Sequence, residues 1–598
     1  MWFTLNEVFS PMILLIAYLL SCKDTVAAHR KLTALPSQRR STRQTGTSVP
    51  VSCRLSQWSG WTECFPCQGK KHRYRTLLQP AKYQGSICTG HLWDEAACQP
   101  TGTCAVGQDC GTDFRCEESG RCIKRHLVCN GEPDCKDASD EADCEDAERF
   151  CDDLYPVPGI SKAAQGYNIL TQKGAQIVYD PTYYGGQCES VYNGEWRDLK
   201  YDAMCERLYY GDDEKYFRKP YNVHFYQFLA HADSGFSSEF YDDSKELLNA
   251  LKKDSSGSRG VTFGIGPTEV PVTLNLGFSL SWSQGTLNNI TDYAAKNLGF
   301  IRATTKVQTA RFKMRRDHIV LDEDILQSLM ELPDQYNYGM YARFINEYGT
   351  HFVTSGTMGG IFEYILVVNK EEMRKRAVSS QTVSSCFGVS IGLSFTVEEV
   401  DLTVGAKWSK NDCSRVGDYS KDSSEKKSFI EDIIPRVRGG DAASIGRLLG
   451  SWNANSYRYW GRSLKLNPTV IDFELQPIDE ILHRTDLAHI ETKRRNLKKA
   501  LDEYLMEFNA CRCGPCQNNG EPVLMGSSCV CECQEGSQGP ACENTSRTGH
   551  PTDGSWSCWT PWAPCQSGAR RRTRQCANPP PQNGGAVCAG RSVQTAAC

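Results

Sequence analysis

Tyr341-Ala-Arg-Phe-Ile-Asn-Glu-Tyr-Gly-Thr-His-Phe352 is the stretch that decides the fold, and Gly356, Gly359 and Gly360 follow it closely. Glycine at this density allows a strand to bend where side chains would clash, so these three positions are predicted to form a hinge. His351 could in principle act as a general base, but no Ser, Asp or second His lies at a spacing that suggests a catalytic triad. We therefore interpret it as a structural histidine.

The chain around this stretch is long and unevenly supplied with cysteine. At 598 residues it is about four times the length of a ~150-residue domain, so several folding units are expected. Most of its 30 cysteines crowd into residues 53–151 and 511–598, and only four lie between, which predicts disulfide-stapled modules around a self-sufficient core at 147–510. With 67 Lys and Arg against 71 Asp and Glu, the net charge of -4 argues against nucleic acid as a partner.

The first forty residues have the features of a secretory leader. An apolar run at 11–20 is followed by small residues up to Ala28, so residues 1–28 are predicted to be a signal peptide. The basic pair Arg39-Arg40 ends a possible propeptide at 29–40, with a solvated basic pair as the alternative. No other stretch approaches the ~18 uninterrupted apolar residues of a membrane helix, so a secreted, soluble product is expected.

Two stretches of the central segment alternate apolar and polar residues with period two, which no helix has. The first spans 270–282, and the second spans 387–397 and resumes at 400–408 after Glu398-Glu399. If the two glutamates form a turn, the apolar side chains of both arms fall on one face of a β-hairpin. The apolar residues are Val270, Val272, Leu274, Leu276, Phe278, Leu280 and Trp282 in the first stretch, and Phe387, Val389, Ile391, Leu393, Phe395, Val397, Val400, Leu402 and Val404 in the second.

These hairpins have the length and the two faces that a membrane strand requires. Residues 387–397 match the ~9–11 residues with which a tilted strand crosses hydrocarbon, and the opposite face of Gly, Ser, Thr, Asp401 and Lys407 suits a water-filled lumen. Cys386 and Cys413 could bridge the base of this hairpin. Each unpaired backbone group in lipid costs several kcal/mol, so insertion requires neighbours and the membrane-active state is expected to be an oligomer. A half-buried soluble sheet, which alternates in the same way, is the alternative.

The first hairpin is expected to return through residues 301–308, where Arg302, Thr304, Lys306 and Gln308 share the polar side. Asn289-Ile-Thr291 is a glycosylation sequon near its tip, and a glycan there would oppose crossing of the bilayer. A second sequon begins at Asn544.

Two segments, 50–104 and 552–598, combine spaced tryptophans with alternating arginines such as Arg73 and Arg75. Guanidinium groups on one face of a strand can interleave with indole planes and hold together a strip that has no core. Both segments resemble thrombospondin type 1 repeats. The resemblance implies mannosylation of the tryptophans Trp58, Trp556, Trp559 and Trp562.

Residues 108–145 carry six cysteines and the acidic run Asn130-Gly-Glu-Pro-Asp-Cys-Lys-Asp-Ala-Ser-Asp-Glu141. A module this small cannot bury enough apolar surface alone, so its gathered acidic oxygens are expected to bind calcium. The spacing resembles an LDL-receptor class A repeat, and an ion-free acidic surface is the alternative. The resemblance implies side-chain ligands at Asn130, Asp134, Asp140 and Glu141 and carbonyl ligands at Leu127 and Glu132.

Tyr341–Phe352 matches the signature of the membrane attack complex/perforin family, and residues 511–543 resemble an EGF-like module. The family resemblance implies an α+β central domain, a bent antiparallel sheet with two helical clusters that unfurl into hairpins. The order of modules is similar to that of the terminal complement components. This implies a secreted, non-enzymatic pore subunit that acts in innate immune cytolysis.

The resemblance also implies a set of disulfides and partners. Family spacing pairs Cys151 with Cys188 and Cys386 with Cys413 and leaves Cys205 over, because Cys22 in the predicted signal makes the number of secreted cysteines odd. Cys205 would then bridge to a lipocalin-like gamma chain. Other implied partners are the beta chain of the eighth complement component, the assembled fifth to seventh components, the ninth component, which the chain would recruit, and the target bilayer.

Three alternatives stay open. If Cys205 is bridged within the chain, the beta chain becomes the better match. An adhesive extracellular protein would use every module, including the central one, for binding. A secreted thiol enzyme would need a free, reactive cysteine.

Overall fold

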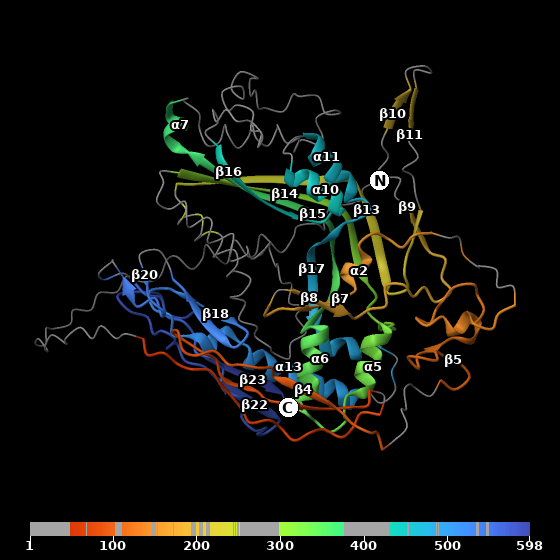
Figure 1. Ribbon diagram of the computed structural model, residues 1–598, viewed down its shortest axis with the longest axis horizontal. Helices are drawn as coiled ribbons and strands as arrows, with labels where there is room; N and C mark the ends of the chain where they lie inside the picture. The colour runs from red at the N-terminus through yellow and green to blue at the C-terminus, as the bar shows by residue number, and fades with distance from the viewer. Residues whose placement is uncertain are drawn as a thin grey trace, which may run out of the picture. The chain divides into compact units, whose positions relative to one another are not determined.

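Seven antiparallel strands form the central sheet, in the order β13-β14-β15-β7-β8, with β16 and β17 both paired to β15 (Figure 1). Together with the helices and small modules around it, this sheet confirms the predicted α+β centre flanked by disulfide-rich modules. The strands are β7 (Gln165–Asn168), β8 (Lys173–Ile177), β13 (Val223–Tyr241), β14 (Leu298–Met314), β15 (His351–Asn369), β16 (Ile430–Arg438) and β17 (Thr469–Pro477).

The computed structural model describes residues 48–597 except 67, 102–109, 146–150, 152–153, 172, 193–198, 203–206, 211–215, 243, 245–246, 248–249, 251–297, 376–429, 451–453, 486, 488–489, 534–536, 546–548 and 550. The predicted signal peptide and propeptide therefore lie outside the described residues. So do the lipid-facing residues of both predicted hairpins, together with Cys205, Asn289, Cys386 and Cys413.

The signature stretch forms a helix, a turn and the start of a strand. Helix α6 (Tyr338–Tyr348) begins where the Asn337 side chain accepts a hydrogen bond from the Met340 amide, and its apolar side is buried. Gly349 ends the helix with a φ of 91°, and a Cβ there would lie 2.7 Å from the Tyr167 nitrogen. Only glycine accommodates both the left-handed backbone and this close approach. The chain then enters β15 at His351.

The central domain has two main hydrophobic cores, one on each side of the point where β15 changes partner. Residues 351–359 of β15 pair with β17, whereas residues 361–368 pair with β16. The larger core packs helices α5, α6, α12 and α13 against the β17 half. A second core packs α10 and α11 against the β16 half. The helices are α2 (Ile160–Ala163), α5 (Glu323–Glu331), α7 (Lys370–Lys375), α10 (Ala442–Gly450), α11 (Ala454–Ser463), α12 (Ile478–Leu482) and α13 (Glu491–Glu507).

Helix α13 has buried residues at a helical period, among them Leu497, Leu501 and Leu505. Residues 301–308 differ from expectation. They lie in β14, paired on both sides inside the sheet, and are therefore not a free return arm of the first hairpin. Their alternation is real, because Arg302, Thr304, Lys306 and Gln308 are half-buried between buried neighbours. Among the described residues, no helix is both long enough and apolar enough to cross a membrane.

The flanking modules consist of short two-stranded ribbons. The first tryptophan-rich repeat contains β1 (Arg54–Leu55), β2 (Lys70–Tyr74), β3 (Leu77–Gln79) and β4 (Trp93–Ala97), and the second contains β22 (Ala569–Thr573) and β23 (Val593–Ala597). The acidic module contains β5 (Phe114–Arg115), β6 (Cys122–Ile123) and the 3₁₀ turns η1 (Arg125–Leu127) and η2 (Ser139–Glu141). The insertion after Cys188 contains β9 (Ser190–Tyr192), β10 (Leu199–Asp202), β11 (Arg207–Tyr210) and β12 (Tyr216–Arg218). The EGF-like segment contains η5 (Ala510–Cys513), β18 (Glu521–Met525), β19 (Ser528–Glu532), β20 (Ser537–Gln538) and β21 (Asn544–Thr545).

Candidate functional site

The two predicted hairpin segments leave the sheet at the same end. Residues 242–297 join β13 to β14, and residues 370–429 join β15 to β16 through α7. These strands are neighbours in the order β13-β14-β15-β16, and all three ladders close at one level. The last pairs are Tyr241 with Phe300, Leu298 with Asn369, and Val368 with Ile430. An antiparallel hairpin in either segment would therefore continue a ladder that already exists.

The three glycines after the signature lie close to atoms of neighbouring segments. A Cβ on Gly356 would lie 2.2 Å from the carbonyl oxygen of Asp472 in β17, and one on Gly359 would lie 1.9 Å from the carbonyl oxygen of Val307 in β14. A Cβ on Gly360 would lie 2.5 Å from Leu464. Real Cβ atoms do not approach other atoms this closely. Backbone carbonyls therefore require glycine at Gly356 and Gly359, whereas at Gly360 the close atoms belong to the side chains of Leu464 and Trp460. All three glycines lie just before the point where β15 changes partner.

Charged side chains of strands β14, β15, β16 and β17 lie near one another across the sheet. The Arg302 guanidinium in β14 donates to the carboxylate of Glu363 in β15 at 2.6 Å, and both side chains are largely buried. Lys306 pairs with Asp472 of β17. Burial lowers the pKa of Arg436, the β16 residue that pairs with Glu363, to about 10, although Glu363 opposes the shift. Burying the Arg302 and Glu363 charges is costly unless they are paired, so a shift of register between β14 and β15 that separated them would be unfavourable.

His351 is fully buried, with its Nδ1 3.0 Å from the Thr350 hydroxyl. Burial lowers its pKa to about 3, so the ring is neutral at physiological pH. An imidazole that is only 6% exposed, with its pKa lowered this far, is poorly suited to general base catalysis. This agrees with its interpretation as a structural histidine.

The acidic loop at 130–141 presents oxygen donors of the kind that calcium prefers. Asp134 and Asp140 are 5% and 1% exposed. Burial, together with the charge of Asp140, raises the pKa of Asp134 to about 6, although a hydrogen bond from Asn130 opposes the shift. The Asp140 carboxylate accepts from the Asp134 amide at 2.7 Å, and Glu141 accepts from the Asn130 amide at 2.8 Å.

This donor chemistry fits calcium. The carboxylates nevertheless engage amides of their own loop, and within the described part of the chain no three Asp, Glu, His or Cys side chains gather closely enough to hold an ion. Calcium binding therefore stays a prediction.

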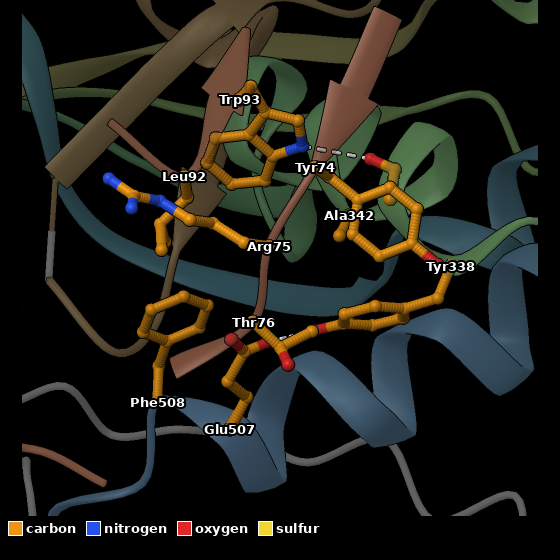
Figure 2. A pocket seen from close by; sticks show the side chains of 10 residues that line it. Tyr74, Arg75, Thr76, Leu92, Trp93, Tyr338, Ala342, Glu507 and Phe508 are labelled. Atoms are coloured by element: carbon orange, nitrogen blue, oxygen red, sulfur yellow. Dashed lines mark hydrogen bonds between the residues drawn. The ribbon is translucent and has the colours of Figure 1, made fainter. Parts of the chain in front are cut away.

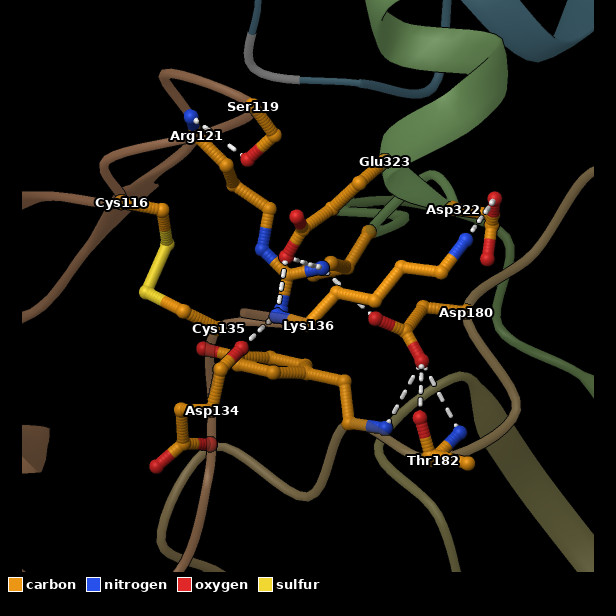
Figure 3. Close-up of polar contacts among 12 residues, drawn as sticks. Cys116, Ser119, Arg121, Asp134, Cys135, Lys136, Asp180, Thr182, Asp322 and Glu323 are labelled. Atoms are coloured by element: carbon orange, nitrogen blue, oxygen red, sulfur yellow. Dashed lines mark hydrogen bonds and ion pairs between the residues drawn. A yellow bond between two sulfur atoms is a disulfide. The ribbon is translucent and has the colours of Figure 1, made fainter. Parts of the chain in front are cut away.

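The same loop is docked onto the central domain by buried ion pairs that the sequence did not reveal (Figure 3). Arg121 of the acidic module lies 2.6 Å from Asp180 and 3.4 Å from Glu323 at the start of α5. Its second Nη donates to the Asp134 carbonyl at 2.6 Å. The residues of this cluster are far apart in the chain, so spacing gives no signal for them.

A second contact joins the loop to β12. The Arg218 guanidinium binds the Glu132 carboxylate with both nitrogens, one of them at 2.8 Å, and lies 3.9 Å from the centre of the Tyr184 ring. Arg218 Nη2 is also 3.2 Å from the sulfur of Cys151, which forms a disulfide with Cys188. Glu132 therefore has two roles to consider: a predicted calcium ligand through its carbonyl, and an anchor through its carboxylate.

The first tryptophan-rich repeat packs on the signature helix and on the end of α13, around a cavity of about 10 Å³ (Figure 2). This is about the room that one water molecule needs, so the cavity is not a ligand site. Trp93 Nε1 donates to the Gly339 carbonyl at 2.9 Å, and the Glu507 carboxylate accepts from Tyr338 and from the Leu77 amide. The cavity is part of a structural joint.

The indoles alternate with guanidinium groups as predicted. Arg73 lies 4.7 Å from the Trp58 ring centre and 4.5 Å from that of Trp61. Arg574 lies 4.2 Å from the Trp556 ring centre, and Arg572 lies between Trp559 and Trp562 at 5.2 and 4.4 Å. Asn544 is exposed in β21. Glycosylation and mannosylation at these residues stay predictions.

The comparisons with known proteins agree with this geometry. The MAC/Perforin domain matches residues 158–514, a complement component EGF-like domain matches 516–544, and the low-density lipoprotein receptor domain class A matches 108–144. The complement component C8 alpha chain of Oryctolagus cuniculus is 53% identical over 97% of this chain and 98% of its own length.

Other complement components are less similar to this chain. The complement component C8 beta chain of Oryctolagus cuniculus is 34% identical over 94% of this chain and 92% of its own length. Complement component C7 of Homo sapiens is 32% identical over 92% of this chain and 62% of its own length. With its central domain matched by the family model and a complement component 53% identical over 97% of its length, the chain belongs to the MAC/perforin family, in the group formed by the complement components.

Proposed function

We propose that this chain is a secreted, non-enzymatic complement subunit of the membrane attack complex, and that it inserts amphipathic β-hairpins into a target membrane as part of an oligomeric pore. The observation that carries the proposal is the common end of the β13-β14-β15-β16 ladders, where both alternating segments are attached. A hairpin that grows from this end begins with its backbone already paired, which removes part of the cost of exposing polar groups to lipid.

The proposal includes the partners that relatives of this kind suggest. A complement C8 beta chain would associate noncovalently, and the assembled fifth to seventh components would deliver the chain to the membrane. The ninth component would be recruited to extend the pore. A pore of many subunits closes the open edges that a single sheet leaves.

Dye-loaded liposomes test the function directly. With all partner components present, the wild-type chain is expected to release the dye, and omission of this chain is expected to prevent release. Crosslinks that tie Ile391 and Leu393 to the body of the protein should abolish release, and reduction of the crosslinks should restore it. An adhesive protein would bind its partners and leave the liposomes sealed.

Cys205 distinguishes an alpha-type from a beta-type chain. It lies in the four-residue connection between β10 and β11, at the end of a hairpin that is paired only to itself among the described strands. We expect an interchain disulfide from Cys205 to a lipocalin-like gamma chain. Nonreducing peptide mapping of the secreted complex should yield a mixed peptide, whereas a bridge within the chain would favour the beta type.

We also propose that the acidic module holds one structural calcium ion. The side chains of Asn130, Asp134, Asp140 and Glu141 and the carbonyls of Leu127 and Glu132 would hold the ion, which would supply the positive charge that the buried carboxylates need. Calorimetric titration of the full chain should detect one calcium site, and magnesium should compete poorly with calcium for this site. Asp140→Asn should lose this site, and unchanged calcium binding in that variant would contradict the assignment.

A further inference from the structure

Helices α10 and α11 are inserted into the chain between β16 and β17, the two strands that share β15. The connection begins at Gly439 and Gly440, directly after β16, and returns through residues 464–468 to β17. Both ends of the helix pair therefore meet at the place where β15 changes partner. Figure 1 shows α10 and α11 beside β14, β15 and β16.

One side chain of this pair fills a slot made by glycines. Trp460 of α11 is fully buried. A Cβ on Gly360 of β15 would lie 2.8 Å from its Cζ2 atom, and a Cβ on Gly440 would lie 2.7 Å from its Cδ1 atom. The indole is thus held between two glycines, one in the strand that bends and one in the turn that follows β16.

A hydrogen bond secures the indole in this slot. Trp460 Nε1 donates to the carbonyl oxygen of Gly439 at 2.9 Å. A Cβ on Gly439 would in turn lie 2.6 Å from the carbonyl oxygen of Gly359. The Ser463 hydroxyl bonds the Trp460 carbonyl at 2.7 Å and the Asp441 amide at 3.3 Å, so the turn and the helix are fastened together.

We propose that Trp460 holds the hinge closed. The indole must leave the slot between Gly360 and Gly440 before the β16 half and the β17 half of the sheet can change the angle between them. A gap of about 0.5–1 Å already forfeits about a quarter to a half of the dispersion attraction between packed atoms, so even partial withdrawal of the indole is costly. The indole also contacts Phe362 in the next inward-facing position of β15, with ring centres 6.1 Å apart. Movement of β15 against α11 would therefore disrupt the ring contact and the contact with Gly360, and movement of the end of β16 against α11 would break the hydrogen bond to Gly439.

Hydrogen exchange of the full secreted chain tests this inference without any membrane. Trp460→Phe keeps an aromatic ring and removes the N–H. We expect the amides of 356–362, 436–442 and 464–470 to exchange about tenfold faster, the factor that corresponds to a loss of roughly 1.4 kcal/mol, the size of one buried hydrogen bond with its packing.

The chain offers a matched control. Trp93 also donates from Nε1 to a glycine carbonyl, that of Gly339, at the same 2.9 Å, but it lies in the joint between the first repeat and α6. Trp93→Phe should accelerate exchange near that joint and leave the hinge amides unchanged. If Trp460→Phe is not secreted, Ser463→Ala removes only the hydroxyl link and should accelerate the same hinge amides by about threefold.

Two outcomes overturn the inference. One is hinge exchange in Trp460→Phe that equals the wild type, and the other is acceleration spread equally over the larger core, as general destabilisation would produce. The inference rests on the proposed function only in its consequence that Trp460→Phe should shorten the lag before dye release. If the hinge amides exchange faster but the chain never releases dye, the proposed function is contradicted and the role of Trp460 is supported. If release is normal and hinge exchange is unchanged, the role of Trp460 is contradicted and the proposed function is supported.

Discussion

At the scale of single residues, the backbone contacts of the hinge glycines limit what each position accepts. Gly359→Ala places a Cβ on the Val307 carbonyl, and neither backbone can move without disturbing the β14–β15 ladder. We expect the variant to lose at least about 2 kcal/mol in the free energy of unfolding, as overpacked sites do. Urea denaturation of the secreted protein, monitored by tryptophan fluorescence, measures this loss.

Gly446 in α10 provides the opposite case, because no atom lies within 4 Å of a Cβ built there. Gly446→Ala should stabilise the helix by about 0.4–1 kcal/mol, since alanine has less backbone freedom in the unfolded chain. Two glycine-to-alanine changes with effects of opposite sign would show that space, rather than glycine itself, decides. Equal effects would contradict the geometry of the hinge.

Asp479 of α12 is a buried acid with little compensation. It is 2% exposed, and burial with the nearby charge of Glu480 raises its pKa to about 6, although Lys498 and Arg494 oppose the shift. The folded state therefore holds this proton more tightly than the unfolded state. The stabilisation by the protonated form is complete below the unfolded pKa near 3.8 and is lost as the pH rises through 6.

Asp479→Asn is therefore expected to stabilise the protein at pH 7.4 by up to about 3 kcal/mol and to have little effect at pH 4. Calorimetric melting at both pH values measures the difference. Glu63→Gln, at an exposed site in the first repeat, is the control and should change neither melting temperature. A lower melting temperature for Asp479→Asn at pH 7.4 would show that the charged form is stabilised instead.

At the scale of elements, the acidic module is joined to β12 and α5 by charges that are not exposed. Glu132→Gln and Arg218→Gln should each cost about 3–5 kcal/mol, because each variant leaves the other group buried without its partner. The double variant should cost less than the sum, since both charges are then gone. Urea unfolding of the four proteins completes the cycle, and additive losses would show that the pair contributes no coupling.

The same elements show what could be predicted from the sequence. The signature and the glycines that follow it are local patterns, so the helix, the turn and the glycine-rich strand that they form could be inferred. The period-two segments are local patterns too, and their hairpins stay a prediction. Arg121, Asp180 and Glu323 come together only through the fold, and each alone resembles an ordinary surface charge. Trp460 was hidden for the same reason, because its slot is made by glycines from two other segments. The misplaced return arm at 301–308 has a different cause: a soluble strand with one buried face alternates as a membrane strand does.

At the scale of the whole molecule, the proposed function predicts which face of the second hairpin would meet lipid. If the pairing of β15 with β16 extended into the second segment in the membrane state, the alternation in the sequence would place Leu393 on one face and its neighbour Ser394 on the other. An arginine near the middle of the bilayer costs about 2–4 kcal/mol on the lipid face of a membrane strand, and substitutions that face the lumen are tolerated. Leu393→Arg is therefore expected to reduce the rate of dye release by roughly 30- to 1000-fold, if that whole cost falls on insertion.

Ser394→Arg is the control. It should release dye at a rate close to wild type, although the conductance of its pores would change. Both variants should assemble with the partner components equally well, as measured by sedimentation, because neither substitution changes a residue of strands β13–β17. Equal release by the two variants would mean that this segment does not cross the membrane as a two-faced hairpin.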